Sequence, residues 1–108
     1  MSNIYRALGD ITRRRILHML KQKAMTQKEI VGEFTISQPA VKKHLKVLLE
    51  EQLVKEEIMG KYRIYHLDSN MLWKAYQKML HDIGDLMDDK LDSLKNFVEK
   101  GEDSNGRG

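Results

Sequence analysis

The sequence of 108 residues has no cysteine and a single proline, and aromatic residues make up only 6% of it. A chain without cysteine forms no disulfide, no thiolate zinc site and no thiol redox switch. Few aromatic rings also disfavour an interface built mainly on stacking. These absences exclude disulfide scaffolds, thiolate zinc proteins and thiol redox proteins before any motif is considered.

Long apolar runs are missing as well. No segment approaches the roughly 20 consecutive apolar residues of a membrane span, and residues 1–6 lack the apolar core of a signal peptide. We therefore expect a cytoplasmic protein. The sequence also has no glycine-rich phosphate loop and no serine with plausible histidine and aspartate partners, so we expect neither an enzyme nor a cofactor.

The formal net charge of +3 conceals two regions of opposite sign. Residues 1–67 contain 13 lysines and arginines against 7 acidic residues, whereas residues 68–108 contain 6 against 9. Phosphate contacts dominate the affinity of proteins for nucleic acids, so a domain with a basic first two-thirds is a candidate polyanion binder. The two regions should face different partners.

Two helices are predicted near the N-terminus. Residues 4–8 carry apolar side chains at helical spacing, and the glycine that follows is typical of a helix end. Asp10 is in position to cap a second helix over residues 11–21. Its predicted apolar stripe is Ile11, Ile16, Leu17, Met19 and Leu20. Arginines 13–15 point in different directions, so only part of that run can face one partner.

The middle of the chain has the outline of a helix-turn-helix. Thr26 and Glu29 match the capping-box pattern at the start of a helix expected to reach Phe34. Ser37 caps a second helix with Pro39 in its first turn, where the missing amide is harmless. The buried stripe of the second helix is predicted to be Val41, Leu45, Leu48 and Leu49. Two capped helices joined by a tight turn are typical of this motif.

A β-hairpin is predicted next. Residues 53–59 and 62–67 are rich in valine, isoleucine and tyrosine, which favour strands, and they flank Gly60 and Lys61 at the turn. A hairpin that follows a helix-turn-helix is a wing. The predicted fold class is therefore mostly α with a small β-hairpin, a winged helix-turn-helix.

One long amphipathic helix, or two abutting ones, is predicted over residues 69–100. Its apolar positions are Leu72, Tyr76, Met79, Leu80, Ile83, Met87, Leu91, Leu94 and Val98. About thirty helical residues span ~45 Å, which is longer than a domain of this size covers with its own core, so part of the stripe needs another chain. Gly84 marks either a kink or a close helix crossing.

The sequence predicts three parts. Residues 1–67 form a DNA-binding domain, with the helix-turn-helix at about 26–49 and the wing at about 53–67. Residues 68–100 form a dimerisation helix, and residues 101–108 form a frayed tail.

Candidate nucleic-acid contacts lie on the second helix of the motif and on the wing. Gln38 can pair with adenine N6 and N7, and outward lysines can donate to guanine or to phosphate. Cations at the wing tip can contact the backbone or the minor groove. The predicted DNA-contacting set is Ser37, Gln38, Ala40, Lys42, Lys43, His44, Lys46, Thr26, Gln27, Lys61, Tyr62 and Arg63. The alternatives are a solvated basic helix, an exposed charged hairpin and, for His44, a packing role.

The segments 10–17 (DITRRRIL), 36–48 (ISQPAVKKHLKVL) and 60–67 (GKYRIYHL) resemble the ArsR-type (ArsR/SmtB) winged-helix repressors. The resemblance covers about residues 3–95. It implies that residues 37–46 form the helix that enters the major groove, that the protein represses transcription, commonly of its own operon, and that an inducer relieves repression. It also implies a homodimer on a two-fold symmetric operator in double-stranded DNA, with an interface on the first and last helices that we assign to Ile4, Tyr5, Leu8, Leu72, Tyr76, Met79, Leu80, Ile83, Met87 and Leu91.

Two departures from the family pattern bear on structure and signal. Ile11 stands where the family usually has proline, which costs little because Asp10 still caps the helix. Many relatives sense metals through a cysteine pair in the helix equivalent to residues 26–34, where this chain has no thiol. The resemblance therefore points to the subset without a metal site, of the SdpR type.

Two other functions compete with a plain repressor. His81 and Asp85 share a helix face at i, i+4, and two chains could in principle complete a tetrahedral metal site, which would make a metal- or ligand-gated sensor. Such a pair is more often a surface ion pair. The second alternative is a winged helix that serves only as a protein-interaction module, against which the basic outward helix argues.

Overall fold

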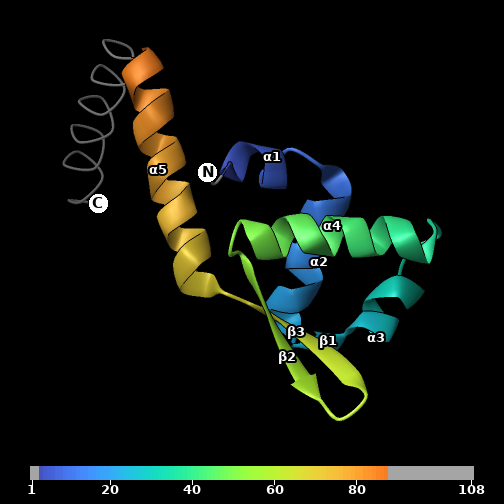
Figure 1. The fold of residues 1–108 in the computed structure, drawn as a ribbon. Coiled ribbons are helices and arrows are strands. Elements are labelled where there is room, and N and C mark those ends of the chain that lie inside the picture. The colour runs from blue at the N-terminus through green and yellow to red at the C-terminus, as the bar shows by residue number, and fades with distance from the viewer. Residues whose placement is uncertain (1–2, 88–108) are drawn as a thin grey trace, which may run out of the picture. The chain divides into compact units, whose positions relative to one another are not determined.

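The computed structural model describes residues 3–87, which form a mostly helical fold with a small antiparallel sheet (Figure 1). The elements are α1 (Ile4–Leu8), α2 (Ile11–Gln22), β1 (Met25–Thr26), α3 (Gln27–Gly32), α4 (Gln38–Glu50), β2 (Val54–Met59), β3 (Tyr62–Leu67) and α5 (Ser69–Met87). The chain divides into two compact units, Met1–Trp73 and Lys74–Gly108. The predicted fold class, a winged helix-turn-helix, is confirmed by this order of elements.

Three of the helices begin at the predicted caps. The carboxylate of Asp10 accepts from the backbone N–H groups of Thr12 and Arg13, the second and third residues of α2, and the hydroxyl of Ser37 accepts from a backbone N–H in the first turn of α4 at 3.3 Å. The capping box of Thr26 and Glu29 is complete at α3, since each side chain accepts from the other residue's backbone N–H. These bonds satisfy amide donors that a helix N-terminus otherwise leaves unpaired.

The core lies between α2, α3 and α4 and the sheet. Its six largest fully buried side chains are Ile16, Ile30, Leu45, Leu48, Leu53 and Val41. The prediction that Ile11 belongs to the stripe of α2 is wrong, because its side chain is 75% exposed. It precedes Ile16 by five residues, which places it about 140° away around the helix. Leu49 is half-buried at the edge of the α4 stripe.

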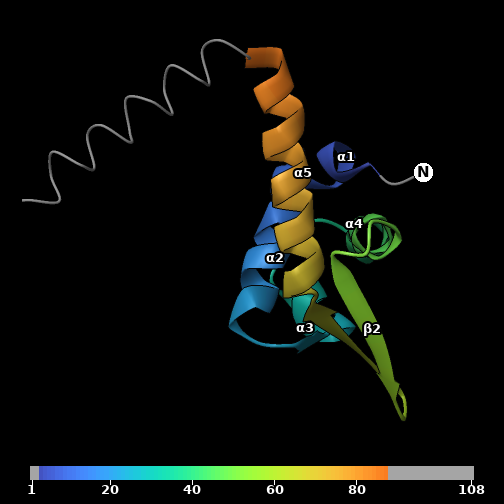
Figure 2. The ribbon, with the colours of Figure 1, turned by 90° about the vertical axis from the view of Figure 1, so that its left-hand side faces the viewer.

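The sheet has three strands in the order β1-β3-β2, whereas the sequence predicted only the hairpin. Met59 pairs with Tyr62 at the turn, and Gly60 adopts a φ of +60°, which glycine tolerates without a steric cost. Met25 of β1 pairs with Tyr65 of β3. The hairpin extends beyond the helices of the same unit, as the wing of this fold does (Figure 2).

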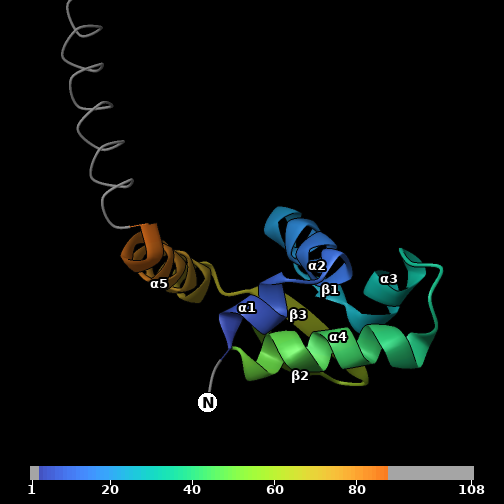
Figure 3. The same ribbon diagram turned by 90° about the horizontal axis from the view of Figure 1, so that it is seen from above.

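The turn between α3 and α4 begins earlier than predicted. The helix α3 ends at Gly32, so the predicted end at Phe34 is wrong by two residues. Arg15 of α2 explains part of the difference, because its guanidinium lies 4.8 Å from the centre of the Phe34 ring and donates to the carbonyl of Glu33 at 3.3 Å. These contacts hold the chain in the turn rather than in the helix. Figure 3 shows the turn from above.

Helix α5 is continuous through Gly84 as far as Met87. Asp68 caps it, since its carboxylate accepts from the backbone N–H of Met71 at 3.1 Å, and that bond is the main reason why the pKa of Asp68 lies below its ordinary value. The predicted continuation to residue 100, which includes Leu91, and the tail 101–108 lie outside the described residues. Over residues 3–87, no helix is long and apolar enough to cross a membrane.

Candidate nucleic-acid interface

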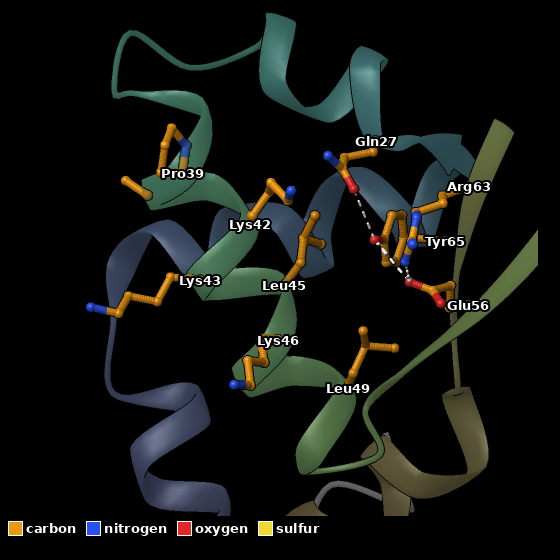
Figure 4. A pocket seen from close by; sticks show the side chains of 11 residues that line it. Gln27, Pro39, Lys42, Lys43, Leu45, Lys46, Leu49, Glu56, Arg63 and Tyr65 are labelled. Carbon is orange, nitrogen blue, oxygen red and sulfur yellow. Dashed lines mark hydrogen bonds and ion pairs between the residues drawn. The ribbon is translucent and has the colours of Figure 1, made fainter. Parts of the chain in front are cut away.

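The outward face of α4 carries three exposed lysines. Val41, Leu45 and Leu48 face the core of the unit, so Lys42, Lys43 and Lys46 are left on the outer and flanking sides of the helix. Figure 4 shows the side chains of Lys43 and Lys46 pointing away from Tyr65 and Glu56.

None of these three amines has a hydrogen-bond or ion-pair partner among residues 3–87. Two lysines of the described chain do have a carboxylate partner: Lys55 lies 3.5 Å from Asp68, and Lys78 lies 3.1 Å from Asp82. Lysines without a carboxylate partner keep their full charge available for an external anion. The outer face of α4 is therefore suited to bind phosphate.

Two open hollows join α4 to the wing. The first, of about 630 Å³, lies between α4 and the sheet and is the one drawn in Figure 4. The second, of about 640 Å³, lies between the helix-turn-helix and the tip of the wing. It is lined by Thr26, Gln27, Lys28, Val31, Gln38, Lys42, Lys61, Tyr62 and Arg63. Seven of the twelve predicted DNA-contacting residues thus line one surface, although they come from segments far apart in the sequence.

The hydroxyls of Ser37 and Thr26 are already engaged within the chain. Each accepts from a backbone N–H group at the start of its own helix. A capping hydroxyl can still meet a phosphate, but its first task is to begin the helix. Ser37 and Thr26 are therefore needed to begin their helices whether or not they contact DNA.

His44 packs against the start of α2. Its side chain is 20% exposed, and its Nδ1 lies 3.1 Å from Nη1 of Arg13 and 3.9 Å from the carboxylate of Asp10. Arg13 also donates to the carbonyl of Ala7 at 3.0 Å. Because Nδ1 accepts from an arginine, the neutral ring carries its hydrogen on Nε2. The packing role is present, and Nε2–H is left as the donor for any phosphate contact.

Asp10 joins this cluster to the N-terminus of α2. Its partial burial raises the pKa of the carboxyl, but the backbone N–H groups of Arg13 and Thr12 outweigh that effect. The pKa of Asp10 therefore lies below its ordinary value. The carboxylate stays ionised at neutral pH and holds both the helix and the cluster in place.

Arg63, a predicted DNA contact, is bound to a carboxylate that the sequence reasoning missed. Its Nη1 lies 3.1 Å from Oε2 of Glu56 on the facing strand. The same carboxylate oxygen accepts from the hydroxyl of Tyr65 at 3.1 Å, and that hydroxyl also lies 3.2 Å from Oε1 of Gln27 (Figure 4). Burial and the bond to Glu56 raise the pKa of Tyr65, so it stays a donor. The alternation of side chains along each strand could have placed Glu56 and Arg63 on one face of the hairpin. Predicting that they form an ion pair also required the pairing register of the two strands.

The tip of the wing combines a cation with an exposed ring. The amine of Lys61 lies 5.5 Å from the centre of the Tyr62 ring, which is itself half-exposed. Ile58 and Met59 beside it are exposed as well. The tip therefore offers both charge and apolar surface to a groove.

The proposed metal ligands do not form a cluster within the described chain. Nε2 of His81 lies 3.6 Å from Oδ2 of Asp85, and both side chains are more than 70% exposed. No group of three or more potential ligands is found among residues 3–87. The pair has the geometry of a surface ion pair on a helix.

The geometry defines a winged helix-turn-helix whose helix α4 has a basic outer face, and comparison with known proteins places it in a family. The profile of the bacterial regulatory proteins of the arsR family matches residues 10–56. The transcriptional repressor SdpR of Bacillus subtilis is 34% identical over 83 residues, which cover 77% of this chain and 92% of SdpR. The chain belongs to the ArsR family of transcriptional regulators.

Other relatives agree with this assignment. The HTH-type transcriptional regulator Rv2034 of Mycobacterium tuberculosis is 39% identical over 64 residues, which cover 59% of this chain and 60% of that protein. Among solved structures, an ArsR-like transcriptional regulator from Rhodococcus sp. RHA1 superposes with a TM-score of 0.67 at 28% identity, covering 87% of this chain and 88% of the other. A second ArsR family regulator gives 0.67 at 25% identity, with 77% and 90% covered.

Proposed function

We propose that the protein is a homodimeric, sequence-specific repressor that binds a two-fold symmetric operator, regulates its own transcription and does not respond to metals through thiols. The observation that carries the proposal is the row of lysines on the outer face of α4, which have no partner among residues 3–87 and lie next to Gln38 at the N-terminus of that helix. Its relative SdpR is named a transcriptional repressor, which supports repression rather than activation.

In the proposed complex, α4 enters the major groove. The exposed side chain of Gln38 reads a base edge, because its amide can make two hydrogen bonds to one adenine. The NH₂ group donates to N7, and the oxygen accepts from the N6 amino group. Lys43 and Lys46 contact phosphates and supply affinity that does not depend on sequence. The tip of the wing, with Lys61 and Tyr62, follows the backbone beside the groove.

The proposed dimer uses the apolar side chains that the chain leaves exposed. Tyr76, Leu80, Ile83 and Met87 on α5 are between 43% and 53% exposed, and Met79 and Leu72 are half-buried. On α1, Tyr5 is 43% exposed and Leu8 is half-buried, whereas Ile4 is buried within the chain and has little surface left for a partner. A stripe of this kind is stabilised when a second copy covers it.

Selection of bound duplexes from a random pool tests the proposal. We expect enriched sequences with two inverted half-sites whose centres lie about one helical turn apart, because two copies of α4 related by a two-fold axis read the same sequence twice. Enrichment of a single asymmetric site, or none above the starting pool, would contradict it. Repression of a reporter placed behind the recovered site, and behind the protein's own promoter, then tests the autoregulation.

A further inference from the structure

Glu56 stands at the centre of a polar network on the surface between α4 and the wing. In the β2–β3 register, Glu56 faces Tyr65, and the neighbouring pair on the same side of the hairpin is Ile58 with Arg63. One oxygen of Glu56 therefore receives the guanidinium of Arg63 and the hydroxyl of Tyr65, each at 3.1 Å. A carboxylate that accepts two such donors is fixed more firmly than one on a free surface.

Burial separates the two halves of this network. Tyr65 is only 3% exposed, and the side chain of Glu56 is 24% exposed, so their contact is partly shielded from water. The side chain of Arg63 remains 56% exposed, and its bond to Glu56 lies at the surface. The guanidinium thus lies between this carboxylate and the open surface where the predicted DNA contacts lie.

Through Tyr65 the network extends to the helix-turn-helix. The hydroxyl of Tyr65 lies 3.2 Å from the side chain of Gln27, the first residue of α3. It has one hydrogen, so it donates either to Glu56 or to Gln27 at any moment, and the charged Glu56 is the stronger acceptor. Glu56 and Gln27 therefore share the hydroxyl of Tyr65 as a donor, and this shared hydroxyl links the wing to α3.

A carboxylate at a DNA-binding surface has an electrostatic cost. Glu56 shares its hollow with Lys42 and Lys46, where a phosphate would approach. Its negative charge repels phosphate, and it competes with phosphate for Arg63. A residue with this cost is expected to lower affinity for DNA of any sequence unless it improves the fit to a particular one.

We propose that Glu56 is a positioning and specificity-determining residue of this interface. It withholds Arg63 from indiscriminate phosphate contact and, through Tyr65, sets the position of Gln27. The proposal rests on the DNA-binding surface described above. If the charge of Glu56 is lost, non-specific binding becomes tighter, and the difference in affinity between operator and random DNA becomes smaller.

The test compares two variants of the full-length protein, in each of which one of two neighbouring glutamates is replaced by the uncharged glutamine. Glu56→Gln keeps the shape of the side chain and an acceptor for Tyr65 but releases Arg63. Glu57→Gln changes the net charge equally, on the opposite side of the hairpin, where Glu57 lies 3.0 Å from His66. Binding to a fixed random-sequence duplex is measured over a range of salt concentrations by fluorescence anisotropy.

For Glu56→Gln we expect non-specific binding to tighten roughly fivefold near physiological salt and the salt slope to steepen by about one unit per protomer, because each protomer gains one phosphate contact. Glu57→Gln should leave the slope unchanged. Equal slopes for the two variants would overturn the proposal. Wild-type protein that binds no duplex in a salt-dependent way would instead refute the DNA-binding surface itself.

Two further variants keep the proposal testable if Glu56→Gln folds poorly. Arg63→Gln in the wild-type background should leave the non-specific salt slope unchanged, since Arg63 is already held by Glu56, and a slope reduced by about one unit would contradict the proposal. Tyr65→Phe removes the link to Gln27 and should weaken operator binding roughly threefold to tenfold without changing the slope. A Tyr65→Phe variant with wild-type operator affinity would remove the positioning role.

Discussion

Helices α4 and α5 are both amphipathic, but they differ in where their apolar side chains go. Val41, Leu45 and Leu48 of α4 are at most 1% exposed, and the opposite face of that helix is basic. In α5, Leu80 and Ile83 are about half-exposed, and Ala75 is its one buried residue among those described. An amphipathic pattern therefore shows that a helix has an apolar face, but not which chain covers it.

The difference in exposure between the apolar faces of α4 and α5 indicates that the two helices suit different kinds of partner. A helix whose apolar face is buried in its own unit presents its polar face, and in α4 that face suits a polyanion. A helix with an exposed apolar face is suited to an apolar surface, which for α5 we propose to be a second copy of the chain. Substitutions on the two helices should consequently affect different measurements.

The largest effect is expected from Leu45→Ala. This removes a fully buried side chain and should lower the free energy of unfolding by about 2–5 kcal/mol, independently of protein concentration. The control is Ile83→Ala on α5, whose effect should grow smaller as the protein is diluted below the dimer dissociation constant. Chemical denaturation at two protein concentrations compares them. An effect of Ile83→Ala as large as that of Leu45→Ala at every concentration would show that α5 is part of the monomer core.

Leu80→Asp should come next, by placing a charge in the exposed stripe of α5. We expect the dimer dissociation constant to rise by roughly 30-fold or more, as for a central interface residue, with the helical content retained. Sedimentation velocity measures the association. Gln77→Asp adds the same charge at an exposed polar position of α5 and should leave the dimer intact; dissociation by both variants would mean that charge alone is responsible.

The double substitution Lys43→Ala with Lys46→Ala should weaken operator binding by at least roughly tenfold and flatten the salt slope by about one unit for each lost phosphate contact. The matched control removes Lys21 and Lys23, two exposed lysines at the end of α2. Anisotropy titrations at several salt concentrations give both quantities. An unchanged slope in the α4 variant would refute its assignment as the phosphate-binding face.

Asp10→Ala should have the smallest effect, a loss of about 1 kcal/mol of folding stability at pH 7 from the missing N-cap. The pKa of Asp10 is depressed in the folded state, so its contribution is present above the ordinary value of 3.8 and is lost as the pH falls through the lower folded value. The difference between wild type and variant should therefore shrink as the pH falls below 3.8. Urea unfolding at pH 7 and at successively lower pH values tests this, and a difference that stays the same in acid would contradict it. Asp10→Asn keeps a capping oxygen at every pH and serves as the control.

The sequence predicted those features that depend on residues close together in the chain. The caps at Asp10, Thr26 and Ser37 were found because each bonds to amides two or three residues away. The wing was found because strand-forming residues flank a glycine at its turn. The outward direction of the α4 lysines followed from helical periodicity alone.

Features that depend on distant residues were not predicted. The strand β1 has two residues, too few for any alternation to show, and it exists because β3 is beside it. The turn after α3 is contacted by Arg15, which lies in another helix. Arg63 was expected to face DNA, but its bond to Glu56 depends on which strand residues the hairpin register places together.

The sequence by itself determined the order of the helices and the hairpin, the caps and the basic outer face of α4, because hydrogen bonding and helical spacing act over a few residues. Only the tertiary structure decided which charges remain unpaired. Lys43 and Lys46 are left without a carboxylate within the described chain, whereas Arg63 has one. The physical reason is that an ion pair between strands forms only when the two side chains lie within a few ångströms of each other. The pairing register of the strands sets that distance, whereas the spacing of the residues along the chain does not.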